Sequence, residues 1–110
     1  MAESRRSVYR IVYPIAMRPA LRIEKTEYKV VDCSESGVRY EHGHNAPPIV
    51  GSKIGGTLVM RHGAEVAVQG EVLQVRQGAV ILLLKAPGIR FAEIMGEQRF
   101  LRAKGYRLTD

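Results

Sequence analysis

The chain of 110 residues has an apolar fraction of 45% and a charged fraction of 25%, values that are ordinary for a soluble globular protein. This length suits a single domain, 1–110, and the sequence contains no apolar run close to the roughly 20 residues that a membrane-spanning helix needs. The net charge of +6 leaves nucleic acid, a membrane surface and a smaller anion open as partners.

The first part of the chain predicts a polar arm followed by short strands. Residues 1–8 are expected to form a flexible basic arm, and residues 9–17 favour a strand that Pro14 bends. A hairpin is expected over Lys25 and Thr26, and further strands are expected at 38–40 and 57–60.

The central part of the chain favours more strands. Residues 64–72 alternate between apolar and polar, which is the period of a half-buried strand, and the phase then shifts, which predicts a bulge near 70–73. Residues 79–84 are expected to form an apolar strand and residues 89–91 a short one. Short strands separated by glycine turns predict an all-β fold, a small antiparallel barrel spanning 9–91.

The C-terminal part changes period. Apolar and polar residues recur at helical spacing, so a helix is expected over 93–104, with Gly105 as its stop. Gly96 is unfavourable inside a helix by about 1 kcal/mol relative to alanine, which offers a later start near Gly96 as an alternative.

The most informative residues form two short motifs in the first third of the chain. Arg6 and Arg10 supply planar guanidinium groups, which pair with phosphates, with the O6/N7 edge of guanine and with purine faces. The alternative is a solvated basic arm.

The second motif, residues 32–37, follows an expected strand and has the composition of a turn. The Asp32 carboxylate could accept from the N1–H and N2–H₂ groups of guanine, and the Ser34 hydroxyl could bind a phosphate or a base. Gly37 leaves a ligand unobstructed. A polar turn that caps its own backbone is the alternative for this segment.

Taken together, the two motifs resemble those of the PilZ domain family. Arg6 to Arg10 fits the RxxxR motif, and Asp32 to Gly37 fits the (D/N)xSxxG motif, in the family order. Ser36 departs from the many members that have a glycine there. The resemblance implies a six-stranded antiparallel barrel with a C-terminal helix.

The resemblance also implies a function: a bacterial signalling protein that binds the second messenger cyclic di-GMP. Arg6, Arg10, Asp32, Ser34 and Gly37 would contact the ligand, and Arg5 would favour an intercalated ligand dimer. Ser36 and Arg39 are further candidate contacts. A conformational change would relay binding to an unidentified protein partner.

Two other functions remain open. One is a PilZ-like adaptor that binds protein without ligand. The other is a small basic barrel that binds single-stranded nucleic acid, against which stand the low aromatic content of 6% and the concentration of basic residues near the termini.

No nucleophile and base are recognisable, so we expect no enzyme, no catalytic residue and no cofactor. His42, His44 and His62 fit no common zinc spacing with Cys33 and are expected to be solvated loop histidines, so we expect no metal. Cys33 alone cannot form an internal disulfide, and the first residues do not look like a secretion signal. A cytoplasmic location is therefore expected.

Overall fold

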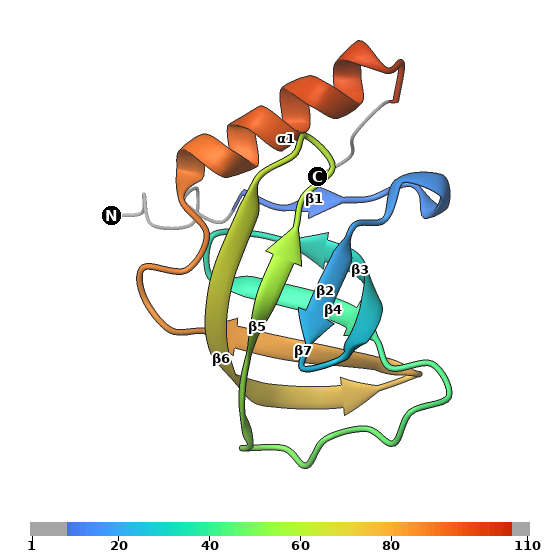
Figure 1. Ribbon diagram of the computed structural model, residues 1–110, viewed down its shortest axis with the longest axis vertical. Coiled ribbons are helices and arrows are strands. Elements are labelled where there is room, and N and C mark those ends of the chain that lie inside the picture. Colours follow the sequence, from blue (N-terminus) through green and yellow to red (C-terminus); the bar gives the residue numbers. More distant parts are fainter. Residues whose placement is uncertain (1–8, 107–110) are drawn as a thin grey trace.

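The structure is a computed structural model that describes residues 9–106 of the chain, and it consists of a small β-barrel with one helix across an end (Figure 1). A short 3-10 turn, η2, lies between the first two strands. The elements in chain order are β1 (Ile11–Val12), η2 (Ile15–Met17), β2 (Ala20–Ile23), β3 (Thr26–Cys33), β4 (Gly37–Glu41), β5 (Lys53–Val59), β6 (Glu65–Arg76), β7 (Ala79–Leu84) and α1 (Phe91–Ala103).

Six strands close the barrel. Neighbours pair antiparallel in the order β3, β2, β5, β6, β7, β4, and pairing between β3 and β4 completes the circle. The expected six-stranded antiparallel barrel with a C-terminal helix is therefore confirmed. β1 lies outside this circle and pairs with the end of β3, where Ile11 faces Cys33 and Val12 faces Asp32.

The interior follows from the alternation of the strands. In β6, Val68, Gly70 and Val72 are buried while the residues between them are exposed. The register between β6 and β7 shifts between Val72 and Gln74, which places the expected bulge at Leu73.

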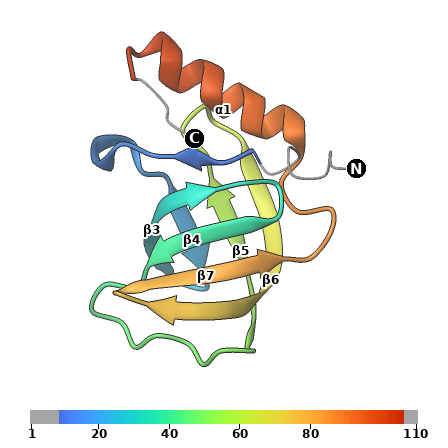
Figure 2. The same cartoon turned by 180° about the vertical axis from the view of Figure 1, so that it is seen from behind.

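Helix α1 covers one end of the barrel and lies beside β1 in both views (Figures 1 and 2). Two apolar residues of its inner face, Ile94 and Leu101, are completely buried. Gly105, with a φ of 91°, follows the helix, where Tyr106 N–H donates to the Leu101 carbonyl at 3.1 Å.

Four expectations about boundaries are wrong. The strand expected over 9–17 covers only Ile11–Val12, and the 3-10 turn η2 follows Pro14. The β2–β3 turn is centred on Glu24 and Lys25, because Ile23 pairs with Thr26. Residues 89–91 form no strand; Ile89 N–H bonds instead to the Glu35 carbonyl at the β3–β4 turn. The helix begins at Phe91, so Gly96 lies inside it.

Candidate functional site

Strands β3, β4 and β7 lie side by side in Figure 2. Their outer face carries a small hollow that gathers several of the predicted site residues. Its volume is about 160 Å³. The residues that line it are Arg10, Asp32, Ser34, Gly37, Val38, Arg39 and Ile81.

The hollow contains an ion pair. Asp32 and Arg39 face each other across the β3–β4 ladder, and Arg39 Nε lies 3.2 Å from Asp32 Oδ2. The Asp32 side chain is 12% exposed and that of Arg39 is 40% exposed. A partly exposed pair of this kind contributes only about 0 to 1 kcal/mol to stability, so its main effect is to orient two charged groups toward the hollow.

The turn after β3 holds Ser34 in place. Its N–H donates to the Gly37 carbonyl at 2.9 Å, and its Oγ accepts from the Ser36 N–H at 3.3 Å. The self-capping turn considered from the sequence is therefore present, and it fixes the Ser34 hydroxyl at the edge of the hollow. Ser36 is exposed and is not among the residues that line the hollow.

Gly37 keeps the hollow open. Its φ is not positive, so the backbone itself does not require glycine there, and a Cβ atom would meet the nearest atom, the Leu82 carbonyl oxygen, at an ordinary 3.5 Å. A side chain at this position would fit the fold and would occupy space in the hollow. Neither the backbone nor the packing therefore requires glycine at this position, which lines the hollow.

The arginine motif reaches the hollow through its second member. Arg10 is exposed, lines the hollow and directly precedes β1. Arg5 and Arg6 lie outside the described residues.

A second hollow of about 230 Å³ adjoins the first and shares Arg39 and Ile81 with it. It adds Gln74, Arg76 and Gln77 from the β6–β7 hairpin. Because they share lining residues, we refer to the two hollows together as the trough. Its arginines at 10, 39 and 76 suit an anionic ligand that offers hydrogen-bonding edges.

A larger hollow of about 600 Å³ lies over β5, β6 and β7. Its exposed lining includes Lys53, Gln69, Glu71 and Lys85, and it contains none of the predicted site residues. We place the candidate site at the smaller trough because the oriented ion pair and the predicted residues meet there.

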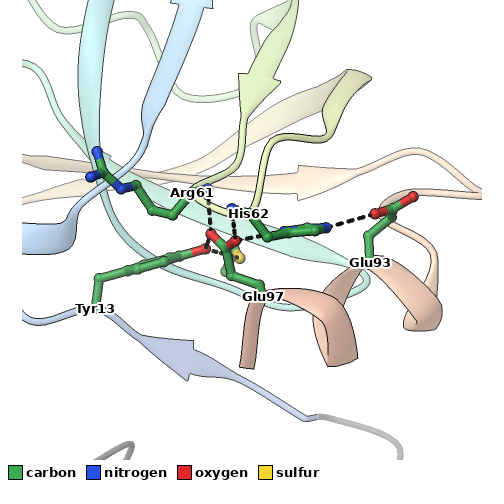
Figure 3. Close-up of polar contacts among 6 residues, drawn as sticks. Tyr13, Arg61, His62, Glu93 and Glu97 are labelled. Carbon is green, nitrogen blue, oxygen red and sulfur yellow. Dashed lines mark hydrogen bonds and ion pairs between the residues drawn. The ribbon is translucent and has the colours of Figure 1, made fainter. Parts of the chain in front are cut away.

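Behind the trough, a buried polar cluster joins α1 to the barrel (Figure 3). Glu97 of α1 is 0% exposed, and both of its carboxylate oxygens are used. Oε2 accepts from Tyr13 Oη at 2.5 Å and from the Arg61 N–H at 2.9 Å. Oε1 accepts from the His62 N–H at 2.9 Å and contacts His62 Nδ1 at 2.7 Å.

Two more residues extend this cluster. His62 Nε2 lies 3.0 Å from Glu93 Oε1, so the imidazole bridges two glutamates of α1. Tyr13 Oη lies 3.7 Å from Cys33 Sγ, and Cys33 sits in β3 directly between Asp32 and Ser34. The cluster thus reaches the inner side of the strand whose outer side carries the trough.

The surroundings shift three pKa values in this cluster. Burial lowers the pKa of His62, but hydrogen bonds and charge from Glu97 and Glu93 outweigh it, and the net pKa is raised above the ordinary value. Burial, reinforced by Cys33 and Glu97, raises the pKa of Tyr13 far above its ordinary value. Burial also raises the pKa of Cys33 to about 12. Tyr13 is therefore a neutral hydroxyl that donates to Glu97.

The sequence argument missed this cluster, and its view of His62 was wrong. His62 is held at both ring nitrogens and is not a solvated loop histidine. The available signal was Glu97, which lies three residues after Ile94 and four before Leu101 and therefore on the apolar face of the helix. Cys33, 1% exposed, packs in the core.

In comparisons with known proteins, no family model, no curated protein and no solved structure matches the chain. Within residues 9–106, no helix has both the length and the apolar character needed to cross a membrane.

Proposed function

We propose that this protein binds cyclic di-GMP at the trough on the outer face of β3, β4 and β7, as PilZ domains do, and passes the signal to a protein partner. The observation that carries the proposal is the Asp32–Arg39 pair, which lies in one hollow with Arg10, Ser34 and Gly37. These groups come from three segments of the chain, and several belong to the two motifs.

The chemistry of each group fits a guanine dinucleotide. Arg10, with Arg6 ahead of it, pairs with the phosphates. The Asp32 carboxylate accepts from guanine N1–H and N2–H₂, which adenine cannot offer. Arg39 presents a planar cation beside that carboxylate, suited to the O6/N7 edge or to a purine face. Ser34 supplies a hydroxyl at the rim.

The charge balance also supports a dianion. Arg10, Arg39 and Arg76 line the trough with Asp32 as the single acidic residue among its lining residues. Two phosphodiester charges of the ligand would be matched by the remaining positive charge. Cyclic di-GMP is therefore a better match to the trough than a neutral or cationic metabolite.

Calorimetric titration with cyclic di-GMP, and with cyclic di-AMP as the comparison ligand, tests the proposal. We expect saturable binding of cyclic di-GMP and at least about tenfold weaker binding of cyclic di-AMP, since a site that hydrogen-bonds its ligand rejects analogues without those groups. Arg10→Ala and Asp32→Ala should each abolish or strongly weaken binding.

The matched control is Lys85→Ala, which removes one exposed positive charge from the larger hollow. It should leave the affinity within about twofold, because a screened charge outside the site contributes little. If Lys85→Ala and Arg10→Ala weaken binding equally, the ligand is attracted by positive charge anywhere on the surface and not by the trough. Saturable binding of a random single-stranded oligonucleotide would then favour the nucleic-acid binder.

Stoichiometry in the same titration tests the role of Arg5. Two ligands per chain in the wild-type protein, falling to one in Arg5→Ala, would support an intercalated dimer, and one ligand per wild-type chain would contradict it. Heat-free titrations with both dinucleotides would instead favour the adaptor that binds protein alone.

A further inference from the structure

Side chains of helix α1 contact the chain on both sides of Arg10. Tyr13, three residues after Arg10, donates to Glu97 at 2.5 Å. Tyr9, directly before Arg10, meets the next helix residue, Gln98. With the Gln98 amide turned to the orientation that satisfies its neighbours, its nitrogen donates to Tyr9 Oη at 2.6 Å and its oxygen accepts from Arg102 Nη2 at 2.7 Å. Two consecutive side chains of one helix thus bracket the ligand-facing arginine.

Besides these contacts, a short strand ladder and the buried side chain of Ile11, 1% exposed, hold the segment. β1 comprises only Ile11 and Val12 and pairs with β3 alone. Beyond that ladder, Tyr13 N–H donates to the Val31 carbonyl at 3.0 Å. A strand this short outside a closed barrel depends on its side-chain contacts for a fixed position.

The end of β3, which pairs with β1, likewise presents different residues on its two sides. Asp32 and Ser34 face the trough, whereas Cys33 between them faces inward and lies 3.7 Å from the Tyr13 hydroxyl. Residues 9–13 and 31–34 therefore carry the ligand groups on one side and the contacts to Tyr13 and α1 on the other.

The Glu97 side chain stabilises this arrangement with both of its carboxylate oxygens. It is fully buried, and four hydrogen-bond contacts from Tyr13, Arg61 and His62 satisfy its two oxygens. Withdrawal of Tyr13 would leave part of a buried acceptor unsatisfied, which is unfavourable. The docked helix and the position of the Arg10 segment thus stabilise each other.

We propose that Tyr13, Glu97 and Gln98 are positioning residues of the trough: docking of α1 sets Arg10 against Asp32, and ligand binding in turn tightens α1. This inference rests on the proposed function. Because linkage is reciprocal, a helix that favours the ligand-competent position of Arg10 must itself be stabilised by the ligand. α1 is then the element through which binding is reported.

The test combines affinity with the reactivity of the only cysteine, Cys33. Tyr13→Phe and Glu97→Gln should each weaken cyclic di-GMP binding by about 5- to 100-fold, the usual range of coupling between sites. The control is Arg99→Gln, which removes one charge from an exposed position of the same helix. It should change the affinity by less than about twofold, because a screened charge outside the site contributes little.

Alkylation of Cys33 by iodoacetamide gives a second measurement. In the wild-type protein, saturating cyclic di-GMP should slow alkylation, because the ligand holds residues 9–13 over Cys33. In Tyr13→Phe, which removes only a hydroxyl and keeps the ring in place, alkylation without ligand should be faster than in the wild-type protein.

The outcomes separate the two proposals. Binding that is lost in Arg10→Ala but unchanged in folded Tyr13→Phe and Glu97→Gln overturns the positioning role alone, even if their alkylation is faster. Should Glu97→Gln fail to fold, Tyr13→Phe decides. If the wild-type protein does not bind cyclic di-GMP, the proposed function is overturned and the positioning role with it.

Discussion

At the scale of single residues, two glycines show the difference between a site and a fold. Gly37 has ordinary backbone angles and room for a Cβ, so its small size benefits the trough. Gly88 has a φ of 67°, and a Cβ there would collide with the Glu35 carbonyl oxygen. Only the second position is fixed by the backbone.

We therefore predict opposite outcomes for the same substitution. Gly37→Ala should keep the unfolding free energy within about 1 kcal/mol of the wild-type value and weaken cyclic di-GMP binding, because the methyl group enters the trough. Gly88→Ala should lower stability by more than about 2 kcal/mol through backbone strain and the clash. Denaturant unfolding and calorimetry measure the two effects, and normal binding by Gly37→Ala would remove this glycine from the site.

At the scale of the element, helix α1 contains Gly96 in its interior, where glycine is unfavourable. A Cβ on Gly96 would lie 3.0 Å from His62 Nε2. The imidazole cannot easily withdraw, because Glu97 and Glu93 hold its two nitrogens. Glycine at position 96 thus lowers the helix propensity of α1 but leaves the space that the His62 ring occupies.

This explanation predicts a reversal of sign. Gly96→Ala alone should lower the unfolding free energy, because the clash with a fixed ring outweighs the roughly 1 kcal/mol that alanine adds to a helix. In a His62→Ala background the same substitution should raise it, since only propensity remains. A double-mutant cycle by urea unfolding gives the comparison, and equal effects in the two backgrounds would show that His62 is not the reason for the glycine.

At the scale of the whole molecule, the buried cluster makes stability depend on pH. His62 faces Glu93 and Glu97 of α1, with Tyr13 and Cys33 behind Glu97. Burial lowers the folded-state pKa of His62, but the combined hydrogen bonds and charges of Glu97 and Glu93 outweigh burial and raise this pKa above its ordinary value. The stabilisation is therefore fully present below the unfolded pKa of about 6.5 and is lost as the pH rises through the folded pKa.

We expect the stability difference between the wild-type protein and His62→Gln to shrink as the pH rises from about 6.5 to about 8, within which Tyr13 and Cys33 stay protonated. Unfolding free energies of both proteins across this range measure the effect. A difference that is constant or grows with pH would contradict a raised pKa at His62.

The sequence predicted the barrel because the alternation of residues 64–72, the bulge and the glycine turns are local signals. The resemblance of the two motifs to PilZ domains also predicted that Arg10, Asp32, Ser34 and Gly37 would lie together, and all four line one hollow. It could not predict the Glu97 cluster, because that depends on a contact between residues 84 positions apart. Arg76 was missed for the same reason: only the register of β6, β7 and β4 brings it near Arg39.

The barrel is closed by pairing of β3 with β4 and does not include β1. β1 can therefore unfold separately from the barrel. The six closed strands keep all their ladders when β1 and α1 leave together, so that departure is a partial opening separate from global unfolding. Amide protons of α1 and residues 11–13 should then exchange with solvent water at a common rate, faster than those of β6 and β7. The protein is therefore expected to lose its structure in two stages, β1 and α1 first and the six-stranded barrel afterwards.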